Sequence, residues 1–156
     1  MNSQHLIESA TRLAIGRGGK PRQADLRCAI STAYYAMFHC VAKACADAFI
    51  GTSKTRNDAA LEQVYRSLTH TQVARCCNRK GIMNTFPGEI QGFGNMFLVL
   101  QSRRYNADYK PSEMFYRSHV LDDIQRAEAA INNFGEAKIS DRKAFAAFAA
   151  TNPRKV

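Results

Sequence analysis

The chain has 156 residues, and its 22 Lys and Arg residues against 13 Asp and Glu residues give it a formal net charge of +9. This length predicts one domain, and an apolar fraction of 46% is ordinary for a globular protein. No run approaches the roughly eighteen apolar residues of a membrane helix, and the first twenty residues lack the apolar stretch of a signal peptide. We therefore expect a cytoplasmic protein that does not enter a membrane. The positive charge favours anionic partners, with nucleic acid first.

The cysteines favour a reducing compartment. Their number is odd, no Cys-x-x-Cys occurs, and no His/Cys spacing resembles a zinc site. The five are Cys28, Cys40, Cys45, Cys76 and Cys77. We expect small apolar side chains with free thiols, and neither a metal nor a cofactor.

Helical periodicity runs through most of the chain, and alternating strand patterns are missing. Helices are predicted at residues 3–15, 22–49, 57–78, 89–106 and 140–150, with a further helix that begins at Pro111 and carries a buried stripe to Phe134. These elements predict an all-α fold, an antiparallel up-and-down bundle of five to six helices. The domain is expected to span residues 1–151, with a loose basic tail at residues 152–156.

The helix predicted at residues 22–49 is apolar around most of its circumference, which predicts a central position in the bundle. Its exception is a row of polar side chains at four-residue steps, here called the polar ridge. The polar ridge consists of Arg27, Ser31, Tyr35, His39, Lys43 and Asp47. Two interpretations stay open: a solvent-facing strip of a core helix, or a helix–helix or subunit interface that carries polar function.

The helix predicted at residues 57–78 carries Arg66 and His70 four residues apart on one face. Histidine is the natural proton carrier near neutral pH, and arginine can stabilise negative charge that develops on a phosphate. The alternative is that both are ordinary surface residues.

The end of the helix predicted at residues 89–106 places Arg104 on the line of the buried face, and Asp108 follows one turn later if the helix persists. An arginine on such a face needs a partner, because an unpaired buried charge is very costly. Asp108 can supply a local ion pair. Alternatively, Arg104 points into a polar seam and binds phosphate with its fork of donors.

Two segments resemble the motifs of HEPN-type domains. Residues 25–39, DLRCAISTAYYAMFH, are similar to the family's Arg, Ala-Ile-Ser and Ala-Tyr-Tyr-Ala-x-Phe-His signature on a long early helix. Residues 104–109, RYNADY, resemble the Arg-x-x-Ala-Asp-Tyr segment of one branch. With the order of the helices, the resemblance covers roughly residues 3–134.

The resemblance implies a helical bundle that forms a two-fold homodimer. In catalytic members an Arg-x(4–6)-His motif from each subunit builds a metal-independent ribonuclease site at the interface. Many members belong to toxin–antitoxin or phage-defence systems, often beside a nucleotidyltransferase-like antitoxin. This chain departs from the catalytic motif, because Tyr109 stands where the histidine is expected, and Arg66 and His70 are one residue too close.

Two hypotheses follow. In the first, the protein acts on RNA, Arg104 binds the phosphate with assistance from Asp108 and Tyr109, and His39 or His70 carries the proton. The further residues predicted to contact RNA are Arg103, Arg66, Arg27 and Lys43. In the second, the chain is a catalytically degenerate HEPN module that binds RNA or a protein partner.

Overall fold

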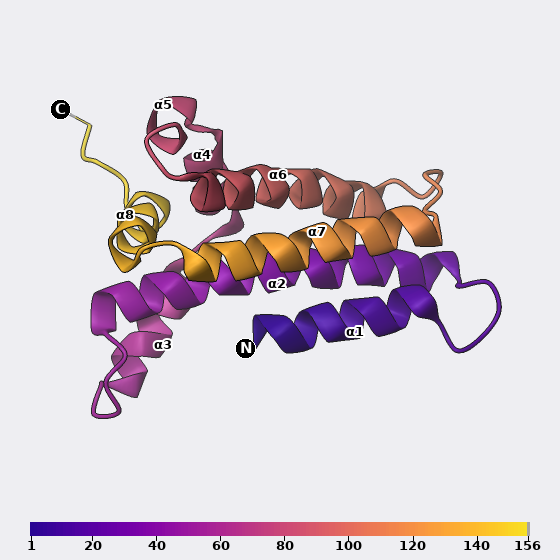
Figure 1. Ribbon diagram of the computed structural model, residues 1–156, viewed down its shortest axis with the longest axis horizontal. Coiled ribbons are helices and arrows are strands. Elements are labelled where there is room, and N and C mark those ends of the chain that lie inside the picture. Colours follow the sequence, from indigo (N-terminus) through magenta and orange to yellow (C-terminus); the bar gives the residue numbers. More distant parts are fainter. Residues whose placement is uncertain (156) are drawn as a thin grey trace.

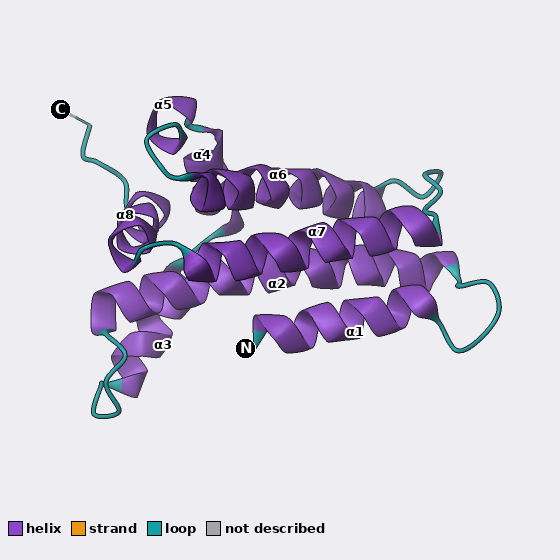
Figure 2. Ribbon diagram, viewed as in Figure 1, coloured by secondary structure: helices purple, strands orange, loops and turns teal. Residues whose placement is uncertain are grey.

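The structure is a computed structural model that describes residues 1–155, and over that range it contains helices and loops without a strand (Figures 1 and 2). The helices are α1 (Ser3–Ile15), α2 (Gln23–Ile50), α3 (Asp58–Ser67), α4 (His70–Asn78), α5 (Lys80–Met83), α6 (Gly88–Tyr109), α7 (Arg117–Glu136) and α8 (Ile139–Ala150). The predicted all-α class is confirmed. No described helix combines the length and the apolar character that spanning a bilayer requires.

Four long helices, α1, α2, α6 and α7, lie side by side and alternate in direction along the chain (Figure 1). The α1 helix packs against α2 and α7, and α6 packs against α2 and α7. The three short helices α3 to α5 form the connection between α2 and α6. The last helix, α8, crosses one end of the bundle, where it contacts α2, α4 and α6. This arrangement leaves α2 in contact with most of the other helices.

The predicted count of five to six helices is wrong, because residues 1–155 contain eight. The helix expected at residues 57–78 is interrupted at Thr69, which begins α4 with a capping box. Thr69 Oγ1 accepts a hydrogen bond from the backbone N–H of Gln72 at 3.2 Å, and Gln72 Oε1 accepts one from the backbone N–H of Thr69 at 2.8 Å. This reciprocal cap starts a new helix even though the apolar pattern continues across the break. The one-turn helix α5 accounts for the remaining difference.

The helix expected to begin at Pro111 instead begins at Arg117. The preceding loop is fixed by Gln23 of α2, whose amide makes two hydrogen bonds with the backbone of Phe115. Gln23 Nε2 donates to the Phe115 carbonyl at 2.8 Å, and the Phe115 N–H donates to Gln23 Oε1 at 2.9 Å. These bonds hold the loop extended and anchor its end against the core, so the helix starts later than the proline suggests.

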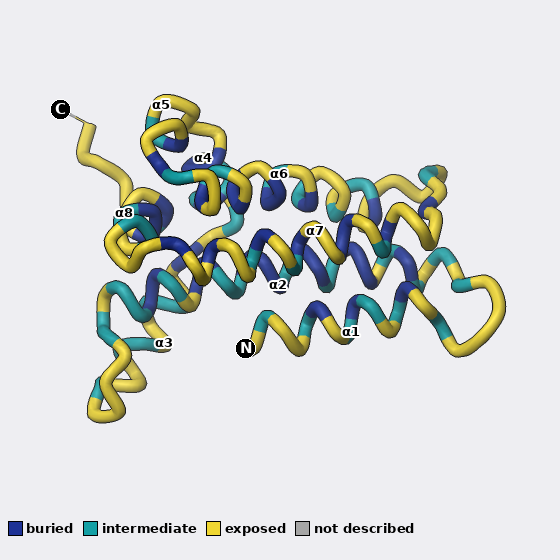
Figure 3. Tube along the Cα trace, in the orientation of Figure 1, coloured by how far each residue is buried: buried dark blue, intermediate teal, exposed yellow. Residues whose placement is uncertain are grey.

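The inner faces of the helices form one continuous apolar core (Figure 3). Its largest fully buried side chains include Tyr34, Phe93, Phe97 and Phe145. Asp123 of α7 is the one buried charged side chain within residues 1–155, and its Oδ2 lies 3.3 Å from Nε of Arg103. Burial raises the pKa of Asp123, while the charge of Arg103 acts in the opposite direction.

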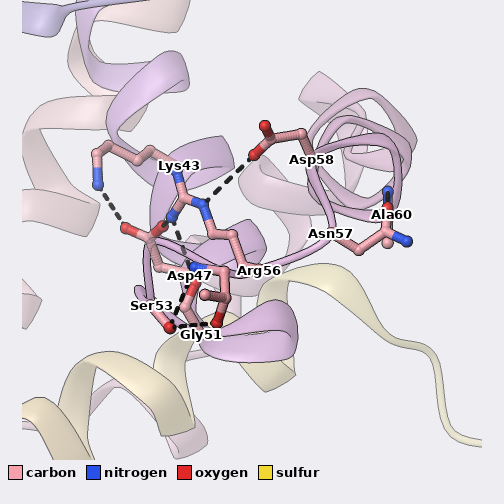
Figure 4. A network of polar contacts seen from close by, with 9 residues as sticks. Lys43, Asp47, Gly51, Ser53, Arg56, Asn57, Asp58 and Ala60 are labelled. Atoms are coloured by element: carbon pink, nitrogen blue, oxygen red, sulfur yellow. Dashed lines mark hydrogen bonds and ion pairs between the residues drawn. The ribbon is translucent and has the colours of Figure 1, made fainter.

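The junction between α2 and α3 is held by a polar network, shown in Figure 4. Arg56 Nη1 lies 3.1 Å from Asp47 Oδ1 and 3.3 Å from the carbonyl oxygen of Gly51, at the C-terminus of α2. Lys43 Nζ pairs with the same Asp47 carboxylate. The network satisfies a terminal carbonyl of α2 and turns the chain toward α3.

Residues 151–155, which follow α8, have no regular structure. Residues 152–155 are exposed, and residue 156 of the predicted basic tail lies outside the described residues. All five cysteines carry free thiols, and Cys45, Cys76 and Cys77 are buried. Within residues 1–155, no three His, Cys, Asp or Glu side chains are grouped as metal ligands.

Candidate functional site at the seam of α2, α4 and α6

Two adjacent tyrosines of α2, Tyr34 and Tyr35, form the centre of the candidate site. Successive residues of a helix point about 100° apart, so the two phenols face different directions. Tyr34 is 0% exposed, and its ring centroid lies 5.3 Å from that of Phe97 in the core. Tyr35 is half-buried at the edge of the helix. The pair therefore connects the apolar core with a polar surface.

Arg104 of α6 lies against both tyrosines. Its Cζ atom is 5.7 Å from the ring centroid of Tyr34 and 5.8 Å from that of Tyr35, within the range of cation–π contacts. Because α6 continues to Tyr109, Asp108 lies one turn beyond Arg104, and its Oδ2 is 2.7 Å from Arg104 Nε. The Nε–H group makes no hydrogen bond, so this contact is an ion pair without hydrogen-bond alignment. Ser31 Oγ donates to the other carboxylate oxygen of Asp108 at 2.8 Å.

The Arg104 guanidinium is not fully engaged by these partners. Its Nη2 is 3.5 Å from the Tyr35 hydroxyl, which is a weak contact. Its Nη1 makes no hydrogen bond within residues 1–155, and the side chain is 25% exposed. The local ion pair that the spacing allows is thus present, and donors remain for an anion as well.

His70, the first residue of α4, lies on the same tyrosine pair. Its Nδ1 atom is 2.8 Å from the Tyr34 hydroxyl oxygen, and its ring stacks on Phe38 with centroids 3.9 Å apart. Its Nε2 atom has no hydrogen-bond partner in the described chain. Burial lowers the pKa of His70 from its ordinary value of 6.5, and the positive charge of Arg104 lowers it further. His70 is therefore mostly neutral near pH 7.

His39 of α2 forms a second histidine–tyrosine pair beside the first. Its Nδ1 atom is hydrogen-bonded to the hydroxyl of Tyr65 on α3, and its ring is tilted against Tyr35 with centroids 6.4 Å apart. Burial lowers the pKa of His39 as well. Arg104, His70 and His39, which come from three different helices, thus border the same tyrosine pair.

Arg27, at the start of the polar ridge, has a different environment. Its Nη1 donates to the carbonyl of Ala107 at 2.6 Å, and its Nη2 donates to those of Lys110 at 3.0 Å and Glu113 at 2.6 Å. The guanidinium also lies over the ring of Phe115, 5.2 Å from its centroid. These contacts cap the C-terminus of α6, so most of the donors of Arg27 are used within the fold.

The polar ridge is therefore a seam between helices of the same chain. Arg27 and Ser31 contact the end of α6, Tyr35 contacts Arg104, and His39 contacts α3. Of the two interpretations left open by the sequence, the structure favours a helix–helix interface for the first four ridge residues.

Four other predicted site residues lie apart from the tyrosine pair. Tyr109 is 63% exposed and packs beside Tyr105, with ring centroids 5.3 Å apart. Arg103 faces Asp123 of α7, and the exposed Lys43 pairs with Asp47. Arg66 lies on α3, is exposed and pairs with Glu62. The prediction that Arg66 and His70 share a helix face is wrong, because α3 ends before Thr69.

The sequence does not predict Tyr34 or Tyr65 as site residues, and it places Ser31 only in the polar ridge. The hydrogen bonds of both tyrosines join segments that are distant in sequence, and no local pattern indicates them. One signal was available: the Thr69-x-x-Gln72 pattern predicts a helix start at His70. That start changes the direction of the chain and brings His70 back against α2.

Comparisons of the chain with protein-family models, with curated proteins and with solved structures gave no match. The fold and the site define an all-α helical protein with an arginine and two histidines around a tyrosine pair. The likeness to HEPN domains accordingly depends on the two sequence motifs.

Proposed function

We propose that the chain is a HEPN-like protein that acts on RNA, as a metal-independent endoribonuclease whose site is the seam of α2, α4 and α6. The observation that supports this most is that Arg104 and His70 border one tyrosine pair. Arg104 keeps an unused Nη1 group there, and His70 keeps an unused Nε2 atom. An arginine beside a neutral histidine can supply charge stabilisation and proton transfer for phosphodiester cleavage by the ribose 2′-hydroxyl.

In this reaction the 2′-oxygen attacks the phosphorus and the bond from phosphorus to the 5′-oxygen breaks. The products are a 2′,3′-cyclic phosphate and a 5′-hydroxyl, so one proton leaves the 2′-oxygen and one is delivered to the 5′-oxygen. Arg104 would hold the charge on the phosphate, and Asp108, fixed by Ser31, would hold Arg104. His39 or His70 would carry the proton from the 2′-oxygen to the 5′-oxygen. Tyr109, beside Tyr105, would stack on a nucleotide base.

The wider setting belongs to the same proposal. The resemblance to HEPN domains favours a homodimer, a toxin–antitoxin or defence system, and a nucleotidyltransferase-like antitoxin as partner. The net charge of +9 favours an anionic substrate, as RNA is. Arg103 and the exposed Lys43 and Arg66 are the cations that we propose for contacts with the RNA backbone.

A second function, RNA binding without cleavage, is favoured by one feature of the site. The Arg104 guanidinium is already paired with Asp108, and the family's histidine position is occupied by Tyr109. A degenerate HEPN module of this kind would bind RNA, or a protein partner, through the same surface.

The test is incubation of the purified protein with a mixed RNA pool in EDTA. Arg104→Met keeps the aliphatic stem and removes the guanidinium, and His70→Gln removes the titrating ring. Each variant should lower the cleavage rate by about 10²-fold or more. The matched controls are Arg126→Met and His5→Gln, because Arg126 is exposed on α7 and pairs only with Asp122, and His5 is exposed on α1. Both controls should cleave within about two-fold of the wild type.

The outcomes separate the two functions. Equal cleavage by the wild type and Arg104→Met would exclude Arg104 from the site and indicate contamination or another centre. Absence of cleavage by the wild type, with RNA binding that weakens as salt rises, would favour the binding module. In that case Arg104→Met should still reduce the affinity for RNA more than Arg126→Met does.

A further inference from the structure

The hydroxyl proton of Tyr34 has one clear destination. Tyr34 is 0% exposed, so water cannot accept the proton, and a buried hydroxyl without an acceptor is strongly disfavoured. The one hydrogen bond of this hydroxyl within residues 1–155 joins it to His70 Nδ1, at 2.8 Å. Burial raises the pKa of Tyr34 to about 12, so the phenol keeps its proton throughout the neutral range.

The direction of this bond determines the state of His70. If the Tyr34 hydroxyl donates, Nδ1 must be the acceptor, and the proton of the neutral imidazole then lies on Nε2. If Nδ1 carried the proton and donated it to Tyr34, the phenol's own proton would be left unpaired inside the protein. Gln101 makes no hydrogen bond with the phenol but lies near enough to lower the pKa of Tyr34, as a donor to the oxygen does. A donor at that position cannot accept the phenol proton, so His70 Nδ1 is the acceptor of that proton.

We infer that Tyr34 is a positioning residue that holds neutral His70 with its proton on Nε2, so that His70 presents a hydrogen-bond donor to a phosphate oxygen of RNA beside Arg104. The role toward phosphate rests on the proposed function, whereas the tautomer is a property of the free protein. In this state Nε2 has no lone pair, so His70 does not accept the proton of the 2′-hydroxyl. That proton goes to His39, the other histidine at the tyrosine pair.

The two histidine–tyrosine pairs provide a matched control. Tyr34 is fully buried, whereas Tyr65 is only half-buried and can exchange its hydroxyl proton with water. Tyr34→Phe removes the donor from His70 and retains the ring that packs on Phe97. Tyr65→Phe makes the same chemical change beside His39 and leaves His70 untouched.

The experiment is nitrogen NMR on ¹⁵N-histidine-labelled protein at pH 7.5, where two-bond proton–nitrogen correlations distinguish the tautomers. The chain has 4 histidines, so the spectrum of His70→Gln assigns the signal of His70. We expect the Nε2–H tautomer of His70 to exceed the other by about ten to one or more in the wild type. Because a free imidazole already favours this tautomer, the test is the change in the tautomer ratio of His70 between the wild type and the variants. Tyr34→Phe should produce a mixture at His70, and Tyr65→Phe should not.

The inference is overturned if wild-type His70 carries its proton on Nδ1. It is also overturned if Tyr34→Phe leaves the tautomer ratio of His70 unchanged. The spectra of the wild type and of Tyr65→Phe are the references for that ratio. A 2′-deoxy oligonucleotide, which has phosphodiesters but cannot be cleaved, then tests the role toward phosphate. It should shift the Nε2 signal of His70 in the wild type and shift it less in Arg104→Met. No shift in the wild type would overturn that role while the tautomer result stands.

Discussion

Removal of the Arg27 guanidinium should destabilise the fold without a direct effect on the candidate site. Arg27 donates to five backbone carbonyls at and beyond the C-terminus of α6, and the two shortest contacts, to Ala107 and Glu113, are both 2.6 Å. A hydrogen bond from a charged donor contributes roughly 1.5–3 kcal/mol, and the contact with Phe115 roughly 0.5–1 kcal/mol. Because several of these carbonyls are partly exposed, water replaces some of the lost bonds. We expect Arg27→Met to lower the free energy of unfolding by about 3 kcal/mol.

For a chain of this length, each kcal/mol lowers Tm by about 2–4 °C, so the midpoint should fall by roughly 6–12 °C. The assay is urea and thermal unfolding followed by the helical circular dichroism signal. Arg27→Lys keeps the charge, but a single ammonium cannot reach the same set of carbonyls, so we expect a loss of about 2 kcal/mol. The control, Arg126→Met on the exposed face of α7, should stay within about 0.5 kcal/mol of the wild type. A loss below about 1 kcal/mol for Arg27→Met would refute the capping role.

Two further predictions concern α4 and the histidines. Thr69→Ala removes the capping box and should lower the free energy of unfolding by about 1 kcal/mol, whereas Thr69→Ser should be nearly neutral; equal urea midpoints for both variants would contradict this. Burial lowers the pKa of His39 and His70, so the unfolded chain binds protons more readily than the folded chain below about pH 6.5. Stability should therefore be complete above that pH and fall as pH falls through the folded pKa values, as measured by urea midpoints at pH 7.5 and 5.5. A His39→Gln/His70→Gln protein should show a smaller fall, and an unchanged fall would assign the dependence to other groups.

The sequence predicts the first two helices well, because their boundaries depend on local signals. The helices expected at residues 3–15 and 22–49 match α1 and α2 to within one residue at each end. Glycines with positive φ, Gly16 at +75° and Gly51 at +85°, end these two helices, where residues with a Cβ atom are strained.

The predictions that failed depend on contacts between distant parts of the chain or on a competing local signal. The helix after Pro111 begins late because Gln23 holds Phe115 from the other side of the bundle, and Pro111 itself gives no sign of this contact. The break before His70 comes from the Thr69 cap, which outweighs an apolar period that continues across it. Of the candidate site, the sequence indicates Arg104, Asp108, His39 and His70 singly. It does not predict Tyr34 as the residue that joins Arg104 to His70, because a buried tyrosine and a buried phenylalanine give the same helical pattern.

The polar side chains of α2 hold in place the helices that border the candidate site. A site between separate helices requires those helices to be held at fixed distances, and α2 contacts each of the helices involved, α3, α4 and α6. Arg27 and Ser31 fix the end of α6 that carries Arg104 and Asp108, while Tyr34 fixes the start of α4 through His70. The polar contacts that align the helices are thus continuous with those that orient the candidate site. Under the proposed function, Arg27→Met should affect RNA cleavage indirectly, through the position of α6. Stabilising conditions should then restore the activity of this variant but not that of Arg104→Met.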